Sequence, residues 1–245
     1  MNFLFDIKSD VGLVRQRNED MAAAIPEKGI FLLADGMGGH AAGDLASRVA
    51  IETVLAYLTE PKIPGRPRAR KDKLLRAVTA ANQAVQLAGH YSGQQGMGTT
   101  LVCLWVGVRQ VDLVHVGDSR AYRYRSGKLE QITNDHTVLR YLLEEGEVEK
   151  GSAEAKQVGH ILTQAIGLEN MLEPEVLRLT YKPGDVFLLC SDGLSDLVAD
   201  EAIAHILEET YPNYQEASQA LIQAALDAGG NDNVTVVLAA HAPES

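Results

Sequence analysis

The stretch FLLADGMGGH, residues 31–40, begins as an apolar strand and ends as a glycine-rich turn. Four apolar residues lead directly to Asp35, and Gly-Met-Gly-Gly separates that carboxylate from His40. Because Gly36 has no side chain, its backbone carbonyl can approach a ligand closely. A carboxylate and a bare carbonyl are oxygen ligands that hard divalent cations prefer. The stretch therefore predicts a buried strand that carries cation ligands at its end.

Three further aspartates stand at the ends of apolar runs. Asp192 follows VFLLCS, Asp118 follows VDLVHVG, and Asp232 comes just before NVTVVLAA. The start of one antiparallel strand lies beside the end of its neighbour, so all four aspartates can share one rim. A single Asp-Gly pair is more often a hairpin turn. Four carboxylates on one rim would repel each other unless cations lay between them, which predicts a Mg²⁺ or Mn²⁺ site. No His/Cys cluster with zinc-like spacing competes.

The composition of the 245 residues makes some classes of protein less probable. The formal net charge of −11 argues against non-specific binding to nucleic acid or to an anionic membrane. Cys103 and Cys190 both lie in apolar runs and are expected to be buried thiols rather than a disulfide. The N-terminus does not resemble a signal peptide, and no apolar window is long enough for a membrane span. We expect a soluble, cytoplasmic protein that is a monomer, since no dimerisation pattern is visible.

The order of helical and strand-like patterns predicts the architecture. Helical periodicity covers residues 46–58, 74–88, 200–209 and 214–228, and strand-like segments cover 99–108, 111–117, 120–132, 186–190 and 233–240. A proline-rich, basic stretch at 59–73 is expected to be a loop, and the polar segment 136–170 a surface excursion with a short helix at most. Two strands precede the first helix pair. Paired helices and grouped strands favour antiparallel sheets with helices outside over a parallel βαβ fold.

Two further groups could act on a substrate. The run RQRNED, residues 15–20, follows an N-terminal strand, and its Arg15 or Arg17 could bind phosphate with parallel hydrogen bonds. His40 could act as an acid near neutral pH. Taken alone, a run such as RQRNED is more often a solvated turn. The residue type of His40 is equally compatible with a surface histidine at a helix start.

Taken together, these residues resemble a known family. The segments RQRNED, ADGMGGHAAGDLAS, GTT, VGDSRAYRYRSG, DHT, LTQAIG, CSDGLSD and GGNDNVTVV are similar, in order and spacing, to motifs of the bacterial metal-dependent Ser/Thr protein phosphatases of the protein phosphatase 2C family. The similarity runs from about residue 7 to residue 239. Asp44 and Gln164 depart from it, standing where a glutamate and an arginine are frequent.

This resemblance implies an α+β fold and an enzyme. The fold would be a four-layer α-β-β-α sandwich of two antiparallel sheets flanked by antiparallel helix pairs. It would form a single catalytic domain over 1–245, with a flap subdomain at about 136–170. The activity would be hydrolysis of phosphoserine and phosphothreonine in proteins by a metal-bound hydroxide, without a covalent intermediate. The cofactors would be two Mn²⁺ or Mg²⁺ ions, and the partners phosphoprotein substrates.

The resemblance also assigns roles to residues. Asp35 would bridge the two ions, the Gly36 carbonyl would bind one of them, and Asp192 with Asp232 would hold the other. A third, weaker ion would fall to Asp118 and Asp192.

The remaining matches concern the substrate and the water around the ions. Arg15, but not Arg17, matches the phosphate-binding arginine. Glu19 and Asp20 match positions that hold metal-bound waters. His40 matches the proposed general acid, and His160 belongs to the flap, which influences substrate choice.

Three alternatives remain open. Cys103 and Arg109 have the C-x5-R spacing of a cysteine phosphatase, but the residues between them, LWVGV, are too bulky for a phosphate-binding loop. A non-catalytic binding module would be expected to have lost some of the candidate ligands, and all are retained. A phosphohydrolase that acts on small molecules fits the same metal centre.

Overall fold

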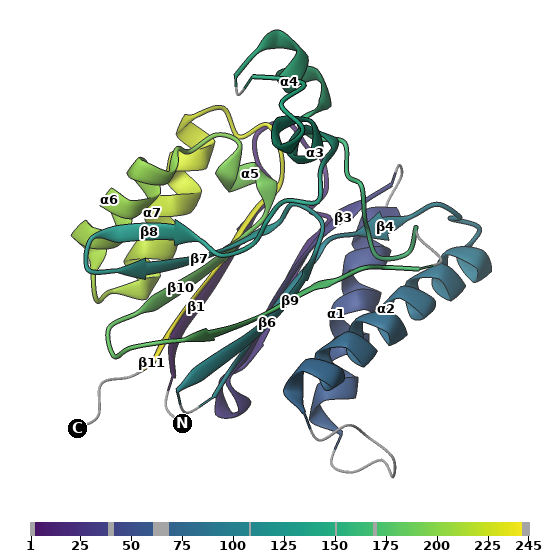
Figure 1. The fold of residues 1–245 in the computed structure, drawn as a ribbon, viewed down its shortest axis with the longest axis horizontal. Coiled ribbons are helices and arrows are strands. Elements are labelled where there is room, and N and C mark those ends of the chain that lie inside the picture. The colour runs from purple at the N-terminus through teal and green to yellow at the C-terminus, as the bar shows by residue number, and fades with distance from the viewer. Residues whose placement is uncertain are drawn as a thin grey trace.

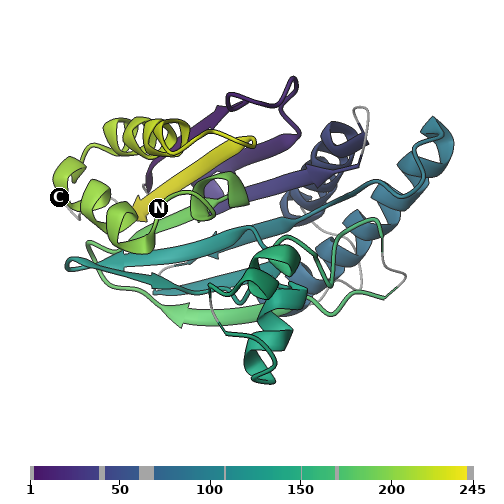
Figure 2. The same ribbon diagram turned by 90° about the horizontal axis from the view of Figure 1, so that it is seen from above.

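The computed structural model describes residues 3–38, 42–60, 69–107, 109–149, 151–168 and 171–241. Its strands form two antiparallel sheets that pack face to face, with helices on the outer side of each (Figure 1). Viewed from above, the two helix pairs lie on opposite sides of the strands (Figure 2). This arrangement confirms the expected four-layer sandwich.

Each sheet is built from strands that are distant in the sequence. The first sheet has the order β1 (Phe3–Asp10), β11 (Val234–His241), β10 (Val186–Cys190), β7 (Arg120–Arg125) and β8 (Lys128–Gln131). The second has the order β2 (Asp20–Ile25), β3 (Ile30–Met37), β5 (Leu101–Val106), β6 (Gln110–Val116) and β9 (Glu175–Thr180), with β4 (Gly98–Thr99) paired to β3. The first and last strands of the chain, β1 and β11, pair along their whole length.

The helices agree with the predicted pairs. The second sheet is covered by α1 (Ala42–Thr59) and α2 (Arg70–Ser92), and the first by α6 (Asp200–Thr210) and α7 (Tyr214–Asp227). The α7 helix ends just before Gly229 and Gly230, whose φ angles are 131° and 53°. Such positive angles favour glycine, which explains the predicted stop. The predicted loop at 59–73 was drawn too long, because Thr59 is the last residue of α1 and residues 70–73 form the first turn of α2. Residues 61–68 lie outside the described part of the chain.

The strand β3 shows how the core is divided. Ile30, Leu32 and Ala34 pack toward α1 and α2, whereas Phe31 and Leu33 pack between the two sheets. This alternation follows from the two-residue period of a strand. Both faces of β3 are therefore covered up to Ala34, and the strand holds Asp35 at a fixed place near its end.

Two strand predictions need correction. The segment Asp20–Ile25 (DMAAAI) is a strand, β2, that the sequence analysis did not anticipate, so three strands precede the first helix pair instead of two. Its three alanines favour a helix intrinsically, and pairing with β3 overrides that preference. The segment 120–132 is a hairpin, β7 and β8, that turns at Ser126 and Gly127.

The excursion at 136–170 contains two short helices, α3 (Val138–Glu144) and α4 (Ala153–Val158), where at most one was expected. The hydroxyls of Thr137 and Ser152 accept hydrogen bonds from backbone N–H groups in the first turns of these helices. Figure 1 shows both helices beyond one end of the sandwich. None of the helices in the described ranges is long and apolar enough to cross a bilayer.

Candidate metal centre

The end of β3 is fixed by the neighbouring strands. Asp20 of β2 lies directly opposite Asp35 in the strand register. The Asp35 N–H donates to the Thr100 hydroxyl at 2.9 Å, and the Thr99 hydroxyl donates to the Asp35 carbonyl at 2.9 Å. The two threonines of the motif GTT therefore hold the backbone around Asp35. These hydrogen bonds do not use the Asp35 carboxylate.

Four predicted aspartates line one cavity of about 510 Å³ at the end of the sandwich: Asp35, Asp118, Asp192 and Asp232. The structure thus brings the four together, with one change from the prediction. They do not share the rim of a single sheet. Asp35 lies in β3 and Asp118 follows β6 of the second sheet, whereas Asp192 and Asp232 adjoin β10 and β11 of the first. The cavity lies where the ends of the two sheets meet.

Gly36 is packed too closely to accept any side chain. A Cβ atom at this position would lie 2.1 Å from the carbonyl oxygen of Gly43 in α1. Gly43 in turn faces Glu19, because a Cβ on it would lie 2.6 Å from Glu19 Oε2. The Glu19 carbonyl accepts hydrogen bonds from the Gly36 N–H and from the hydroxyl of Ser47. The glycines of the motif thus let α1 approach β3 beside the cavity.

The run RQRNED is held against β11 by Asn233. The side-chain amide of Asn233 donates to the carbonyls of Val11 and Arg17, and its Oδ1 accepts from the Glu19 N–H at 2.8 Å. Arg15 forms an ion pair with Asp232, with 2.6 Å between Nη2 and Oδ2. The Arg15 side chain is 53 % exposed and lines the cavity, and its guanidinium has further N–H donors that Asp232 does not use.

The carboxylates raise one another's pKa values. Burial, followed by the charges of Asp20, Asp192 and Asp118, raises the pKa of Asp35 well above its ordinary value. Burial and the neighbouring charge of Asp118 do the same for Asp192. Burial raises the pKa of Asp20 to about 6 and that of Asp118 to about 7. A shift of this direction means that the protein stabilises these groups poorly as anions, so a bound cation would relieve a cost that is already present.

The donor set fits hard divalent cations. Two buried carboxylate oxygens, Asp20 Oδ1 and Asp192 Oδ1, have no hydrogen-bond partner within the described part of the chain. Asp20 Oδ2 accepts from the hydroxyl of Ser191 at 2.8 Å. All the candidate ligands are oxygens, as Mg²⁺ and Mn²⁺ prefer. Among the described residues, these aspartates do not form a group of three whose ligand atoms lie within 4.8 Å of one another. Mg²⁺ usually keeps several waters and is held by only one or two carboxylates.

The other predicted residues have different positions. His160, at the end of α4, is exposed and lines the same cavity as the aspartates. Glu19 lines it as well, and burial raises the pKa of this carboxyl group. His40 lies outside the described residues, so its predicted role stays a prediction. The departure Gln164 accepts a hydrogen bond from the Glu173 N–H and so bonds to the chain that returns from the excursion.

Asp196 belongs to this centre and was not predicted. It follows α5 (Asp192–Ser195), and together with Asp192 and Asp232 it lines an adjoining cavity of about 300 Å³. Burial raises its pKa, with a further contribution from Asp135. The spacing of four residues in CSDGLSD, one helical turn, is the signal that could have identified it.

The cysteine phosphatase alternative does not fit the structure. Cys103 lies in the middle of β5, is 0 % exposed, and pairs with Leu32 and Val114 on the neighbouring strands. Burial raises the pKa of its thiol to about 12. A nucleophilic cysteine needs an accessible thiolate, so this residue is a core side chain.

This chain matches both a family model and individual known proteins. A family model described as Protein phosphatase 2C matches residues 14–228. The chain is 41 % identical over 233 residues to the serine/threonine protein phosphatase PstP of Mycobacterium tuberculosis, covering 95 % of this chain and 44 % of that protein. The chain thus spans less than half the length of this relative.

Two further similarities cover nearly complete chains. The serine/threonine phosphatase stp of Listeria monocytogenes is 34 % identical over 244 residues, with 95 % of this chain and 94 % of that protein covered. The crystal structure of the PstP catalytic domain in complex with two manganese ions superimposes with a TM-score of 0.85 at 39 % identity. That comparison covers 97 % of each chain.

Proposed function

Because the chain belongs to the protein phosphatase 2C family, we propose that it is a metal-dependent protein serine/threonine phosphatase. It hydrolyses phosphoserine and phosphothreonine in proteins without a covalent intermediate. The observation that carries the proposal is the single cavity in which Asp35, Asp118, Asp192 and Asp232 lie beside Arg15. Carboxylates suit divalent cations, and a guanidinium suits the phosphoryl oxygens of the substrate. The names of the PstP and stp relatives support the substrate class.

Four ligands are proposed for the two central ions, which are Mn²⁺ or Mg²⁺. The groups that would hold these ions are the carboxylates of Asp35, Asp192 and Asp232 and the carbonyl of Gly36, which all line the cavity. When bound, such ions lower the pKa of water and so supply a nucleophile at neutral pH. The manganese complex of PstP supports the number two. Glu19 and Asp20 are proposed to orient water by accepting its hydrogen bonds, which suits the unpartnered Asp20 Oδ1.

A third, weaker ion is proposed at Asp118 and Asp192. The pKa values of both carboxyl groups are raised, and Asp118 and Asp196 each contribute to raising that of Asp192. Asp196 supplies additional negative charge at this place. Protonation competes with a cation here, so this ion is expected to bind more weakly at lower pH.

The remaining residues act on the phosphate ester. Arg15 binds the phosphoryl oxygens with the donors that Asp232 does not use. His40 protonates the departing serine or threonine oxygen. His160 contacts the substrate from the side of the excursion, since it is exposed at the cavity.

We treat 1–245 as one catalytic domain because residues from Arg15 to Asp232 line the same cavity, and 136–170 as its flap.

The proposal is tested by comparing substrates at equal concentration. A phosphothreonine peptide, a nucleoside monophosphate and a sugar phosphate would each be incubated with the protein and Mn²⁺, and released phosphate would be measured. We expect the phosphopeptide to be hydrolysed with the highest kcat/KM. A preference for the nucleotide or the sugar phosphate would instead identify a small-molecule phosphohydrolase, and no turnover on any substrate would identify a binding module.

Two inhibitors separate the metal mechanism from a thiol mechanism. EDTA is expected to abolish hydrolysis, and added Mn²⁺ to restore it. An alkylating reagent is expected to have no effect on the folded protein, because Cys103 and Cys190 are both 0 % exposed. Inactivation by alkylation at full Mn²⁺ would contradict the proposal.

A further inference from the structure

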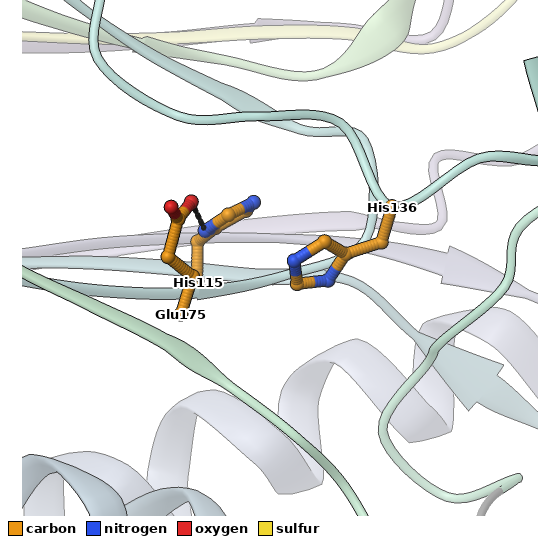
Figure 3. A group of neighbouring side chains, drawn as sticks. All are labelled: His115, His136 and Glu175. Atoms are coloured by element: carbon orange, nitrogen blue, oxygen red, sulfur yellow. Dashed lines mark ion pairs between the residues drawn. The ribbon is translucent and has the colours of Figure 1, made fainter. Parts of the chain in front are cut away.

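A second group of metal-ligand side chains lies outside the aspartate cavity. His115 of β6, His136 of the segment after β8 and Glu175 of β9 each offer one ligand atom, and these atoms lie within 4.8 Å of one another. Figure 3 shows the three side chains converging on one place from these separate segments. They are 21 and 39 residues apart along the chain, which is why no zinc-like spacing was visible in the sequence.

His115 presents a bare nitrogen to this group. Its side chain is 0 % exposed, and its Nε2 lies 2.8 Å from the carbonyl oxygen of Asn134. A carbonyl only accepts, so Nε2 carries the proton and Nδ1 of the neutral ring has a lone pair. Burial lowers the pKa of His115, which favours this neutral form. Nδ1 is buried and has no hydrogen-bond partner among the residues that the structure describes.

Glu175 faces that bare nitrogen. Its Oε2 lies 3.4 Å from His115 Nδ1 (Figure 3). Two atoms that both carry lone pairs repel each other unless a proton or a cation lies between them. A proton on His115 would create a buried charge, which the lowered pKa disfavours. For an ion with bonds of 2.0–2.1 Å in tetrahedral geometry, adjacent ligands are about 3.3 Å apart, which matches the observed separation.

His136 completes the group. Its ring lies 4.3 Å from the His115 ring, centroid to centroid, and Figure 3 shows a ring nitrogen of His136 directed toward His115. Burial and the neighbouring His115 lower the pKa of His136 to about 4, so the ring is neutral at neutral pH. Its Nδ1 accepts a long hydrogen bond, 3.3 Å, from the Gly117 N–H.

The surroundings also resemble those of bound metals. Ligating histidines usually donate their second ring N–H to a carbonyl or carboxylate, and ligating carboxylates are themselves hydrogen-bonded. Asn134 serves both purposes, because its carbonyl accepts from His115 and its amide donates to Glu175 Oε1 at 3.2 Å. The Glu175 side chain is 28 % exposed, so the group of three can be reached from solvent.

We propose that His115, His136 and Glu175 form a site for one zinc-class transition ion, separate from the Mg²⁺ or Mn²⁺ centre. Two imidazoles and one carboxylate suit Zn²⁺ or Co²⁺, whereas Mg²⁺ prefers oxygen ligands only. This inference does not depend on the proposed phosphatase activity.

One consequence links the two sites. If His136 binds the ion through Nε2, its proton moves to Nδ1, which can then no longer accept from the Gly117 N–H. Gly117 directly precedes Asp118. Occupancy of the zinc-class site is therefore expected to loosen the backbone that carries Asp118.

The test measures Zn²⁺ binding to the full chain in excess Mg²⁺, which keeps the carboxylate cavity saturated. A chromophoric chelator that competes for Zn²⁺ reports stoichiometry and affinity. We expect one Zn²⁺ per chain, and affinity at least about tenfold lower in Glu175→Gln and in His136→Gln, because loss of even an outer-shell partner costs that much. The matched control is His205→Gln, since His205 and Glu209 also lie 3.4 Å apart but are 67 % exposed. This control is expected to bind like the unaltered protein.

Two measurements on the unaltered chain make the test independent of variant folding. Co²⁺ is expected to give the intense visible absorption of a tetrahedral site, and Zn²⁺ is expected to shift the Gly117 amide signal in an NMR spectrum. The proposal is wrong if folded variants keep the original affinity, if Mg²⁺ displaces the Zn²⁺, or if neither spectroscopic change occurs.

Discussion

Asp20 and Asp35 lie directly opposite each other on β2 and β3, and both carboxyl groups have raised pKa values. The register of β2 and β3 places the two acidic groups side by side, which destabilises the fold electrostatically at the position where cations are proposed to bind. This destabilisation predicts measurable effects of pH, metal ions and substitutions.

The first prediction concerns pH and stability in EDTA. The pKa of Asp20 rises from 3.8 to about 6 on folding, and that of Asp118 from 3.8 to about 7. Between about pH 4 and pH 7 the folded state therefore binds more protons than the unfolded state, so the free energy of unfolding falls as pH rises. We expect the melting temperature in EDTA to be lower at about pH 8 than at about pH 5.

Two comparisons sharpen this expectation. Mn²⁺ should raise the melting temperature more at the higher pH, where no protons have to be displaced from the ligands. In EDTA, the free energy of unfolding of the Asp20→Asn variant should depend less on pH than that of the unaltered protein. The difference over this pH range should be a few kcal/mol at most, since one pKa unit corresponds to about 1.4 kcal/mol. An EDTA slope of the opposite sign in the unaltered protein would contradict the reasoning.

The second prediction concerns Asp192→Ala. This change removes a carboxylate that is proposed to hold an ion, and metal ions contribute several kcal/mol to the transition state. We expect the Mn²⁺-dependent kcat/KM on a phosphothreonine peptide to fall at least about 10³-fold. The control is Asp227→Ala, which alters an exposed aspartate near the end of α7 and should leave the rate unchanged. Residual activity within tenfold of the original would exclude Asp192 as a ligand.

The third prediction separates Arg15 from Arg17. Arg15→Lys keeps a positive charge but loses the planar pair of donors, so KM for the phosphopeptide should rise about tenfold or more. Its ion pair with Asp232 is 53 % and 36 % exposed, so the melting temperature should change little. Arg17→Lys, at a residue of the same run that is also exposed, should affect neither quantity. Equal effects of the two changes would remove the specific role of Arg15.

The fourth prediction concerns Gly36→Ala. The added Cβ would meet the Gly43 carbonyl oxygen at 2.1 Å, so either β3 or α1 must move. We expect unfolding at a temperature lower by several degrees and weaker Mn²⁺ binding measured by calorimetry, because overpacking costs about 1–3 kcal/mol. Gly159→Ala is the control, since Gly159 has helical backbone angles and its nearest neighbour would be 3.5 Å away. An unperturbed Gly36→Ala variant would mean that this packing is looser than described.

Much of this architecture could be anticipated from local patterns. The apolar runs before Asp35 and Asp192 are covered on both faces, and such strands read clearly in a sequence. The helix pairs also followed from periodicity, with α7 ending before its two glycines. These features depend on residues that are close in the chain, which is why spacing alone identified them.

The features that were missed depend on contacts between distant segments. The alanines of β2 have no strand-like pattern of their own, and only pairing with β3 makes them a strand. The meeting of two sheet ends at one cavity depends on how the sheets stack. Likewise, His115, His136 and Glu175 become neighbours only through the pairing of β6 with β9 and the return of the chain after β8.

The full-length pairing of β1 with β11 also constrains when the protein can mature on the ribosome. Asn233 bonds to the Arg17 carbonyl across 216 positions of sequence, so neither the run that contains Arg15 nor Asp232 can reach its final place before nearly all of the domain has been synthesised. Closing so long a loop is entropically costly and slow. A nascent chain is therefore expected to lack the complete aspartate cavity until β11 emerges, and so is a product that terminates before β11.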